Sequence, residues 1–156
     1  MRFILLDRVT EIVPGVRISA VKAVTLAEEY LADHFPKFPV LPGVMMIEAL
    51  VQTAAMLVQV TNDFAQSIVV LHEARNVKYK SFVKPGNLLE MSLVAKSIEP
   101  EESSFVASGT VEGRGIVDAR LKLRHFNLVQ RSESLADVDD RIINEMRTRA
   151  QLVGAC

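Results

Sequence analysis

Apolar and polar residues alternate along several stretches in the second half of the chain. Alternation with a period of two predicts half-buried β-strands, because successive side chains of a strand point to opposite faces of the sheet. The predicted strands cover residues 77–83, 88–97, 104–112 and 116–126. A Pro-Gly pair at 85–86 and a Gly-Arg-Gly triplet at 113–115 supply turns between them. This half of the chain therefore predicts an antiparallel meander.

Residues 44–60 follow a different pattern, in which apolar residues cover nearly every face of a helix. A helix that is apolar all round lies in the core of a domain. The segment contains Glu48, Gln52 and Gln59, and it is shorter than the ~20 apolar residues that a membrane span requires. We therefore expect a buried helix and no membrane span.

Two more strands are predicted before this helix, over residues 3–9 and 16–25, with a turn at Pro14-Gly15. Residues 25–32 have a short helical periodicity. Near the end of the chain, residues 137–152 predict an amphipathic helix whose acidic start and basic end match the helix dipole. This order of elements predicts an α+β fold, with a curved antiparallel sheet around the central helix and an extra C-terminal helix.

The composition narrows the class of protein. A chain of 156 residues is expected to form one domain with a sizeable core. Its net charge of −1 provides no general attraction to nucleic acid. The lone cysteine, Cys156, excludes an internal disulfide framework, and the N-terminal residues lack the pattern of a signal peptide, so we expect none. We expect a cytoplasmic protein, and no spacing of metal ligands is present.

Residues 34–43 (His-Phe-Pro-Lys-Phe-Pro-Val-Leu-Pro-Gly) form the most unusual stretch. Prolines at every third position remove backbone donors and fix the backbone, which predicts a stiff, extended loop. Pro42 suits the first turn of the helix that follows, because the missing amide hydrogen would have no partner there. This loop joins the two residues that carry the candidate chemistry.

Those two residues are His34, at the start of the loop, and Glu48, in the first turns of the apolar helix. Burial would favour a protonated Glu48 that can donate a proton, and Gln52 lies four residues later, where it can hold the carboxyl group. A histidine base beside a neutral carboxylic acid suits β-elimination. The free amides of Gly43 and Val44 at the helix start can polarise a thioester carbonyl.

Simpler interpretations of both residues remain open at this point. A histidine beside a proline-rich loop is usually a solvated or hydrogen-bonded loop residue. A lone glutamate in an apolar helix can equally serve a structural hydrogen bond, although carboxylates are rarely left buried without a partner.

The motifs resemble those of bacterial (3R)-3-hydroxyacyl-acyl-carrier-protein dehydratases. The similarity lies in His34-Phe35-Pro36, Pro39-Val40-Leu41-Pro42-Gly43, Ile47-Glu48-Ala49 with Gln52, the opening residues 3–9, and Phe82-Val83-Lys84-Pro85-Gly86 with Leu88-Leu89. It covers roughly residues 3–126. The resemblance implies a hotdog fold over residues 1–126, and it leaves residues 127–156 as a C-terminal extension with an amphipathic helix.

The resemblance also implies roles for these residues. His34 matches the catalytic base, Glu48 the acid, and Gly43 the residue whose amide binds the thioester carbonyl. The family works as homodimers that share active sites, sometimes as trimers of dimers, on substrates carried by acyl carrier protein. Asp33 departs from the family pattern, which has glycine there; the added carboxylate either perturbs His34 or points to solvent.

Four basic residues form a cluster near the Pro-Gly turn: Arg75, Lys78, Lys80 and Lys84. They are either a docking site for an acidic carrier protein or a solvated strand face. His72 and His125 lie in strand patterns and are expected to be structural.

The sequence thus predicts dehydration of 3-hydroxyacyl thioesters to trans-2-enoyl thioesters without a cofactor. The alternatives are a hotdog acyl thioesterase and a non-catalytic acyl-thioester-binding protein. Acyl chain length, and the choice between carrier protein and coenzyme A, stay open.

Overall fold

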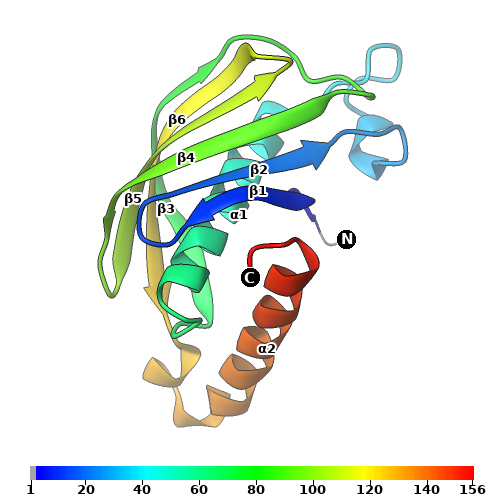
Figure 1. The fold of residues 1–156 in the computed structure, drawn as a ribbon. Coiled ribbons are helices and arrows are strands. Elements are labelled where there is room, and N and C mark those ends of the chain that lie inside the picture. Colours follow the sequence, from blue (N-terminus) through cyan, green and yellow to red (C-terminus); the bar gives the residue numbers. More distant parts are fainter. Residues whose placement is uncertain (1–2) are drawn as a thin grey trace.

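A computed structural model describes residues 3–156. One curved sheet wraps around a single long helix, and a second helix lies beside the open side of that arrangement (Figure 1). The elements in chain order are β1 (Arg8–Val13), β2 (Arg17–Ala23), the 3-10 helix η1 (Glu29–Leu31), α1 (Gly43–Thr61), β3 (Ile68–Tyr79), β4 (Leu88–Ile98), β5 (Glu102–Val111), β6 (Arg114–Phe126), the 3-10 helices η2 (Leu128–Gln130) and η3 (Glu133–Leu135), and α2 (Ala136–Leu152).

The sheet is antiparallel throughout, with strand order β1-β2-β4-β5-β6-β3. The predicted meander is present as β4, β5 and β6. Val117, Ala119, Leu121 and Leu123 are buried on one face of β6, as the alternation predicts. β3 pairs with β6 and forms one edge of the sheet, and β1 forms the other.

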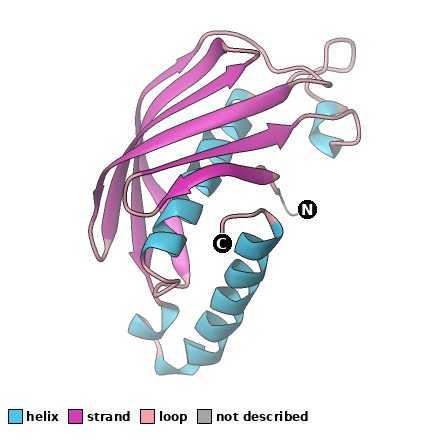
Figure 2. Ribbon diagram, in the orientation of Figure 1, coloured by secondary structure: helices cyan, strands magenta, loops and turns pink. Residues whose placement is uncertain are grey.

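α1 supplies the centre of the core, and Figure 2 shows the sheet curving around one side of it. It contacts β2, β3, β4, β5 and β6, and Leu50, Leu57 and Val58 are fully buried. The helix is long and apolar enough to cross a membrane by length and composition. More than half of its apolar window is buried inside the domain, however, which is typical of a core helix.

Two predicted strands have different bounds in the structure. Residues 3–7 do not form part of a strand; they run across α1, where Gln52 bonds to the backbone of Phe3 and Leu5. β3 begins at Ile68 and ends at Tyr79. Of the strand predicted over residues 77–83, only residues 77–79 belong to β3, and the remainder lies in the loop that follows. The pattern missed the first part of β3 because both faces of this edge strand are partly exposed.

Two smaller predictions also need correction. The helical periodicity over residues 25–32 yields only the short η1. The loop predicted to be extended is folded back on itself: Phe35 and Phe38 exchange two backbone hydrogen bonds, and the amide of Val40 donates to the carbonyl of His34. Three prolines stiffen the segment without keeping it straight, because the residues between them are free to turn.

The C-terminal segment (residues 127–156) is attached to the rest of the protein at several points. The amide of Val9 in β1 donates to the carbonyl of Val153. Arg147 of α2 bonds to the carboxylate and carbonyl of Asp63, just beyond α1. Ala150, Val153 and Ala155 are buried in the main core, so the segment closes over the edge of the domain.

Candidate active site

His34 lies in the turn after η1, and its imidazole is held by the loop that it opens. Glu28, the N-cap residue of η1, forms an ion pair at 2.6 Å with the buried Lys22 of β2. Nδ1 of His34 lies 3.0 Å from the carbonyl oxygen of Val40. A carbonyl only accepts, so Nδ1 carries a proton and, in the neutral ring, Nε2 keeps the lone pair. The histidine is therefore in the tautomer of a general base.

The loop around His34 packs on the segment that follows β3. Phe38 meets the edge of Phe82 at a centroid distance of 5.6 Å, and Lys84 lies 5.0 Å from the Phe38 ring. The amide of Leu41 also donates to the carbonyl of Val83. Asp33 is exposed, which agrees with the interpretation that its carboxylate points to solvent.

α1 begins at Gly43, with Pro42 as its N-cap residue and no side chain capping the first turn. The first amides of a helix have no partner within it, so Gly43 and Val44 offer free donors to a ligand. A Cβ at residue 43 would lie 2.9 Å from ring carbons of Tyr79. A larger residue at position 43 would displace the Tyr79 ring, which packs on the helix start, and burial raises the pKa of this tyrosine.

Glu48 lies one turn further along α1 and is half-buried, not fully buried as the apolar sequence around it suggests. Its flanking residues Ile47 and Ala49 are buried, which places the carboxyl group at the margin of the core. Gln52 donates from Nε2 to Oε1 of Glu48 at 3.0 Å. The predicted hydrogen bond between these two side chains is confirmed.

The amide of Gln52 has four hydrogen bonds. Besides Glu48, Nε2 donates to the carbonyl of Phe3 at 3.1 Å. Oε1 accepts from the backbone amide of Leu5 at 3.0 Å and from Nη2 of Arg149 at 3.1 Å. Arg149 was not predicted as a site residue, because it lies 97 positions away from Gln52 and belongs to an ordinary amphipathic pattern.

The structure thus brings Gly43, Val44, Glu48 and Gln52 together on α1, with His34 on the preceding loop. Among the described residues, His34 bonds to Val40 and Glu48 bonds to Gln52, but the two do not bond to each other. Within one chain His34 and Glu48 are therefore each oriented by separate partners.

The basic cluster is exposed in all four members. Arg75 pairs with Glu73 at 2.9 Å, and Lys80 pairs with Asp118 at 2.5 Å. Two of the four cations are thus partly neutralised by neighbours on the sheet. The other two histidines differ from each other: His72 is exposed, whereas His125 is buried with Nε2 2.8 Å from the hydroxyl of Ser103. Burial lowers the pKa of His125.

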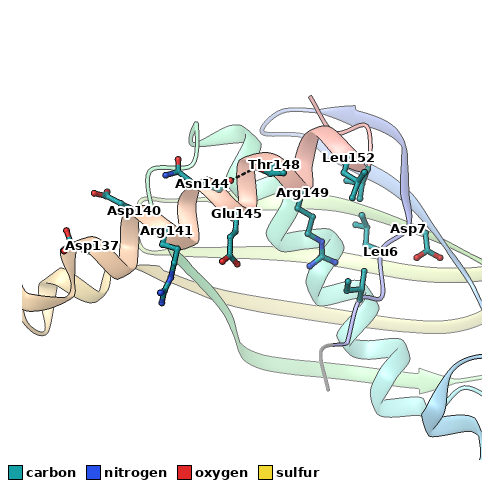
Figure 3. A pocket seen from close by; sticks show the side chains of 12 residues that line it. Leu6, Asp7, Asp137, Asp140, Arg141, Asn144, Glu145, Thr148, Arg149 and Leu152 are labelled. Carbon is teal, nitrogen blue, oxygen red and sulfur yellow. Dashed lines mark hydrogen bonds between the residues drawn. The ribbon is translucent and has the colours of Figure 1, made fainter.

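Two cavities border α2. The larger, about 840 Å³, lies between α2 and the N-terminal residues Ile4, Leu6 and Asp7 (Figure 3). The second, about 230 Å³, lies between α1, the start of β3 and α2, with Gln52 and Arg149 in its wall. Neither cavity has His34 or Glu48 in its wall, although the second reaches the partner of Glu48.

Comparisons with known proteins cover most of the chain. A model of the FabA-like domain family matches residues 1–122. The 3-hydroxyacyl-acyl-carrier-protein dehydratase FabZ of Geobacter metallireducens is 34% identical over 122 residues, which are 77% of this chain and 81% of the relative. FabZ of Cereibacter sphaeroides (strain ATCC 17025) is 39% identical over 121 residues, 76% of this chain and 74% of the relative.

Solved structures share the fold at low sequence identity. The dehydratase heterocomplex ApeI:P from Xenorhabdus doucetiae superimposes with a TM-score of 0.71 and 17% identity, over 85% of this chain and 90% of the other. A hypothetical thioesterase with coenzyme A from Streptococcus pneumoniae has a TM-score of 0.56 and 12% identity, over 77% of this chain and 85% of the other. α2 lies beyond the residues that the family model matches.

Proposed function

The chain belongs to the FabA-like domain family, and we propose that it removes water from (3R)-3-hydroxyacyl thioesters carried by acyl carrier protein, with His34 as base and Glu48 as acid. Its curved antiparallel sheet around α1 has the hotdog fold that the sequence motifs imply. The FabZ relatives support the reaction, a step of fatty-acid synthesis. The assignment of the two residues rests on their geometry.

The observation that carries the proposal is that His34 and Glu48 are each held by one hydrogen bond, which leaves one reactive atom of each side chain to the substrate. The bond from Nδ1 to Val40 leaves Nε2 of His34 free to accept the C2 proton. The bond from Gln52 to Oε1 of Glu48 leaves Oε2 to deliver a proton to the departing hydroxyl. The C2–H and C3–O bonds break, the C2=C3 bond forms, and water leaves. The amide of Gly43 stabilises negative charge on the thioester oxygen, so no cofactor is required.

We propose further that each active site combines His34 of one subunit with Glu48 of another. β3 has an edge with no partner among residues 3–156, and Val70 on this strand is 45% exposed. An open edge with apolar side chains is a template for another strand. A second copy pairing there would give a homodimer, and three such dimers could assemble into a hexamer.

Catalysis is tested by following hydration of an enoyl thioester, through loss of its conjugated absorbance. We expect His34→Ala and Glu48→Gln each to lower the rate about 100-fold or more, the usual contribution of a positioned acid or base. His72→Ala and Glu90→Gln, at exposed positions, are the matched controls. Wild-type rates in either catalytic variant would refute the assignment. Release of free thiol would indicate a thioesterase, and no reaction at all a binding protein.

Subunit sharing is tested by mixing the two inactive variants under conditions that exchange subunits. A heterodimer of His34→Ala and Glu48→Gln contains one site with both residues intact if the site is shared. We therefore expect part of the activity to return. If each chain supplied its own pair, every site in the mixture would stay inactive.

We propose a weaker role for Arg75, Lys78, Lys80 and Lys84 in receiving the acidic carrier protein. Lys78 and Lys84 are exposed, and neither forms an ion pair with a carboxylate among residues 3–156. Changing both to glutamate should raise KM for a carrier-protein substrate and leave KM for the matching coenzyme A thioester unchanged. Equal effects on both substrates would place the cluster outside carrier recognition.

We also propose that the protein works in the cytoplasm, and that residues 127–156 are an addition to a catalytic domain of residues 1–126. The end of the family match at residue 122 supports this boundary.

A further inference from the structure

The C-terminal segment reaches the catalytic acid through one intermediate side chain. Nη2 of Arg149 donates to Oε1 of Gln52 at 3.1 Å, and Nε2 of Gln52 donates to Oε1 of Glu48 at 3.0 Å. We propose that Arg149 is a positioning residue that fixes the amide of Gln52, and through it the orientation of the Glu48 carboxyl group. This inference rests on the proposed role of Glu48 as acid.

The donors and acceptors around Gln52 determine which end of its side-chain amide faces Arg149 and which faces Glu48. The two ends of a glutamine amide have nearly the same shape, and only their partners determine which end faces which neighbour. A guanidinium donates and never accepts, so Arg149 requires the oxygen of Gln52 on its side. The NH₂ group must then face Glu48. Because Nε2 donates to Oε1 of Glu48, the acidic proton is left to Oε2, the atom free to meet a substrate hydroxyl.

The backbone amide of Leu5 supports the same orientation of Gln52 but is a weaker partner. It is a neutral donor, at 3.0 Å from Oε1, whereas a hydrogen bond from a charged group is roughly twice as strong. Residues 3–7 lie outside the strands, and their backbone bond to the sheet is made at Asp7, whose amide donates to the carbonyl of Val21. Arg149 comes from a helix of 17 residues and provides the firmer support.

α2 is also held against the domain by contacts other than Arg149. Asp139 at the start of α2 accepts bonds from Ser67, Leu128 and Val129. Arg147 bonds to Asp63, and Val153 accepts from Val9. Figure 3 shows Arg149 projecting from α2 toward the segment that carries Leu6. α2 is thus held at several points besides the bond from Arg149 to Gln52.

This contact is outside what the family match assigns, because that match ends at residue 122. The proposal therefore gives the C-terminal segment a function in catalysis that the shared domain does not predict. It also implies that the acid of this protein is oriented by one more partner than residues 1–122 can supply.

The test compares Arg149→Ala with Arg147→Ala in the full-length protein. Both remove an arginine that ties α2 to the domain, but only Arg149 bonds to Gln52. We expect Arg149→Ala to lower kcat roughly tenfold, as the loss of one hydrogen bond predicts, with little change in KM. Arg149→Lys should recover part of kcat, and Arg147→Ala should keep wild-type kcat. Equal losses in Arg149→Ala and Arg147→Ala would mean that only docking of α2 matters.

A double-mutant cycle tests whether Arg149 acts through Gln52. In a Gln52→Ala background, Arg149→Ala should have no further effect on kcat, because its target is gone. Multiplicative losses would overturn the proposal. The outcome is separable from the catalytic assignment: if Glu48→Gln is inactive while Arg149→Ala equals wild type, only the role of Arg149 fails. Activity in Glu48→Gln would instead remove the premise.

Discussion

Residues 3–126 and the C-terminal segment are held in place by different kinds of interaction. The first region forms a continuous antiparallel sheet around an apolar helix, with backbone ladders along every strand pair. The second is attached by a few polar contacts, by the buried Ala150, Val153 and Ala155, and by partly buried Ile143 and Met146 that pack on the core. The comparison teaches that one chain can fold by broad apolar burial and then add a helix through a smaller apolar contact and specific hydrogen bonds.

Asp139 illustrates the second kind of interaction. It is 5% exposed although it lies in the first turn of an amphipathic helix. Burial by itself would raise its pKa, but the hydrogen bonds from Ser67, Leu128 and Val129 outweigh this and hold the pKa below its ordinary value. The ionised carboxylate of Asp139 therefore links α2 to η2 and to Ser67, the residue before β3.

The largest effect on stability is expected at the centre of the first region. Leu57→Ala removes a fully buried side chain of α1 and should lower the free energy of unfolding by about 2–5 kcal/mol. Denaturant titration measures the change. Leu152→Ala is the matched control, because this leucine of α2 is 85% exposed and should change stability by less than about 0.5 kcal/mol. Similar losses in both variants would contradict the contrast between the two regions.

A more local effect is expected from Asp139→Asn. The asparagine side chain has only one acceptor oxygen, and its NH₂ group donates, so it cannot replace both carboxylate oxygens that accept from Ser67, Leu128 and Val129. The junction between η2 and α2 should therefore loosen. Hydrogen exchange should then speed up in residues 127–140 and stay unchanged in β4, β5 and β6. Asp140→Asn, at an exposed neighbour, should leave both regions as they are. A uniform increase in exchange would show that the segment and the sheet open as one unit.

The smallest effect concerns pH and the buried His125. Because burial lowers its pKa, the unfolded chain binds a proton at His125 at a higher pH than the folded chain does. The stabilisation that the neutral His125 contributes is fully present above the ordinary histidine pKa of 6.5, and it falls as the pH drops below that pKa. Thermal melts of the wild type and His125→Gln between pH 7.5 and 5 should therefore converge or cross on acidification. If the melting temperatures of the two proteins changed in parallel with pH, His125 would not contribute to the pH dependence of stability.

The sequence predicted the parts of the fold that depend on one-sided burial. The meander and α1 were identified because their apolar residues recur with the period of a strand or cover a whole helix. β3 was only partly found, since both of its faces are partly exposed and Val70 breaks the alternation. Residues 3–7 have strand-like composition but are held by the side chain of Gln52, and no local pattern reveals such a partner.

The candidate site was predictable to a similar extent. The spacing of Glu48 and Gln52 on one helix predicted their hydrogen bond, which the structure contains. The extent of Glu48 burial was overestimated, because its position at the helix margin depends on how α1 sits in the sheet. His34 was identified by its motif, and its bond to Val40 depends on a folded loop that the prolines did not suggest. Arg149 required the three-dimensional contact.

The four partners of Gln52 have a consequence for how this protein can evolve. Two of them are backbone atoms, the carbonyl of Phe3 and the amide of Leu5, and these persist whatever side chains mutation places there. Glu48 is constrained by its proposed chemistry, so Arg149 is the partner whose side chain can be exchanged while the backbone and the proposed acid stay in place. Substitutions at residue 149 would therefore adjust how firmly Gln52 is oriented without altering the reaction centre itself.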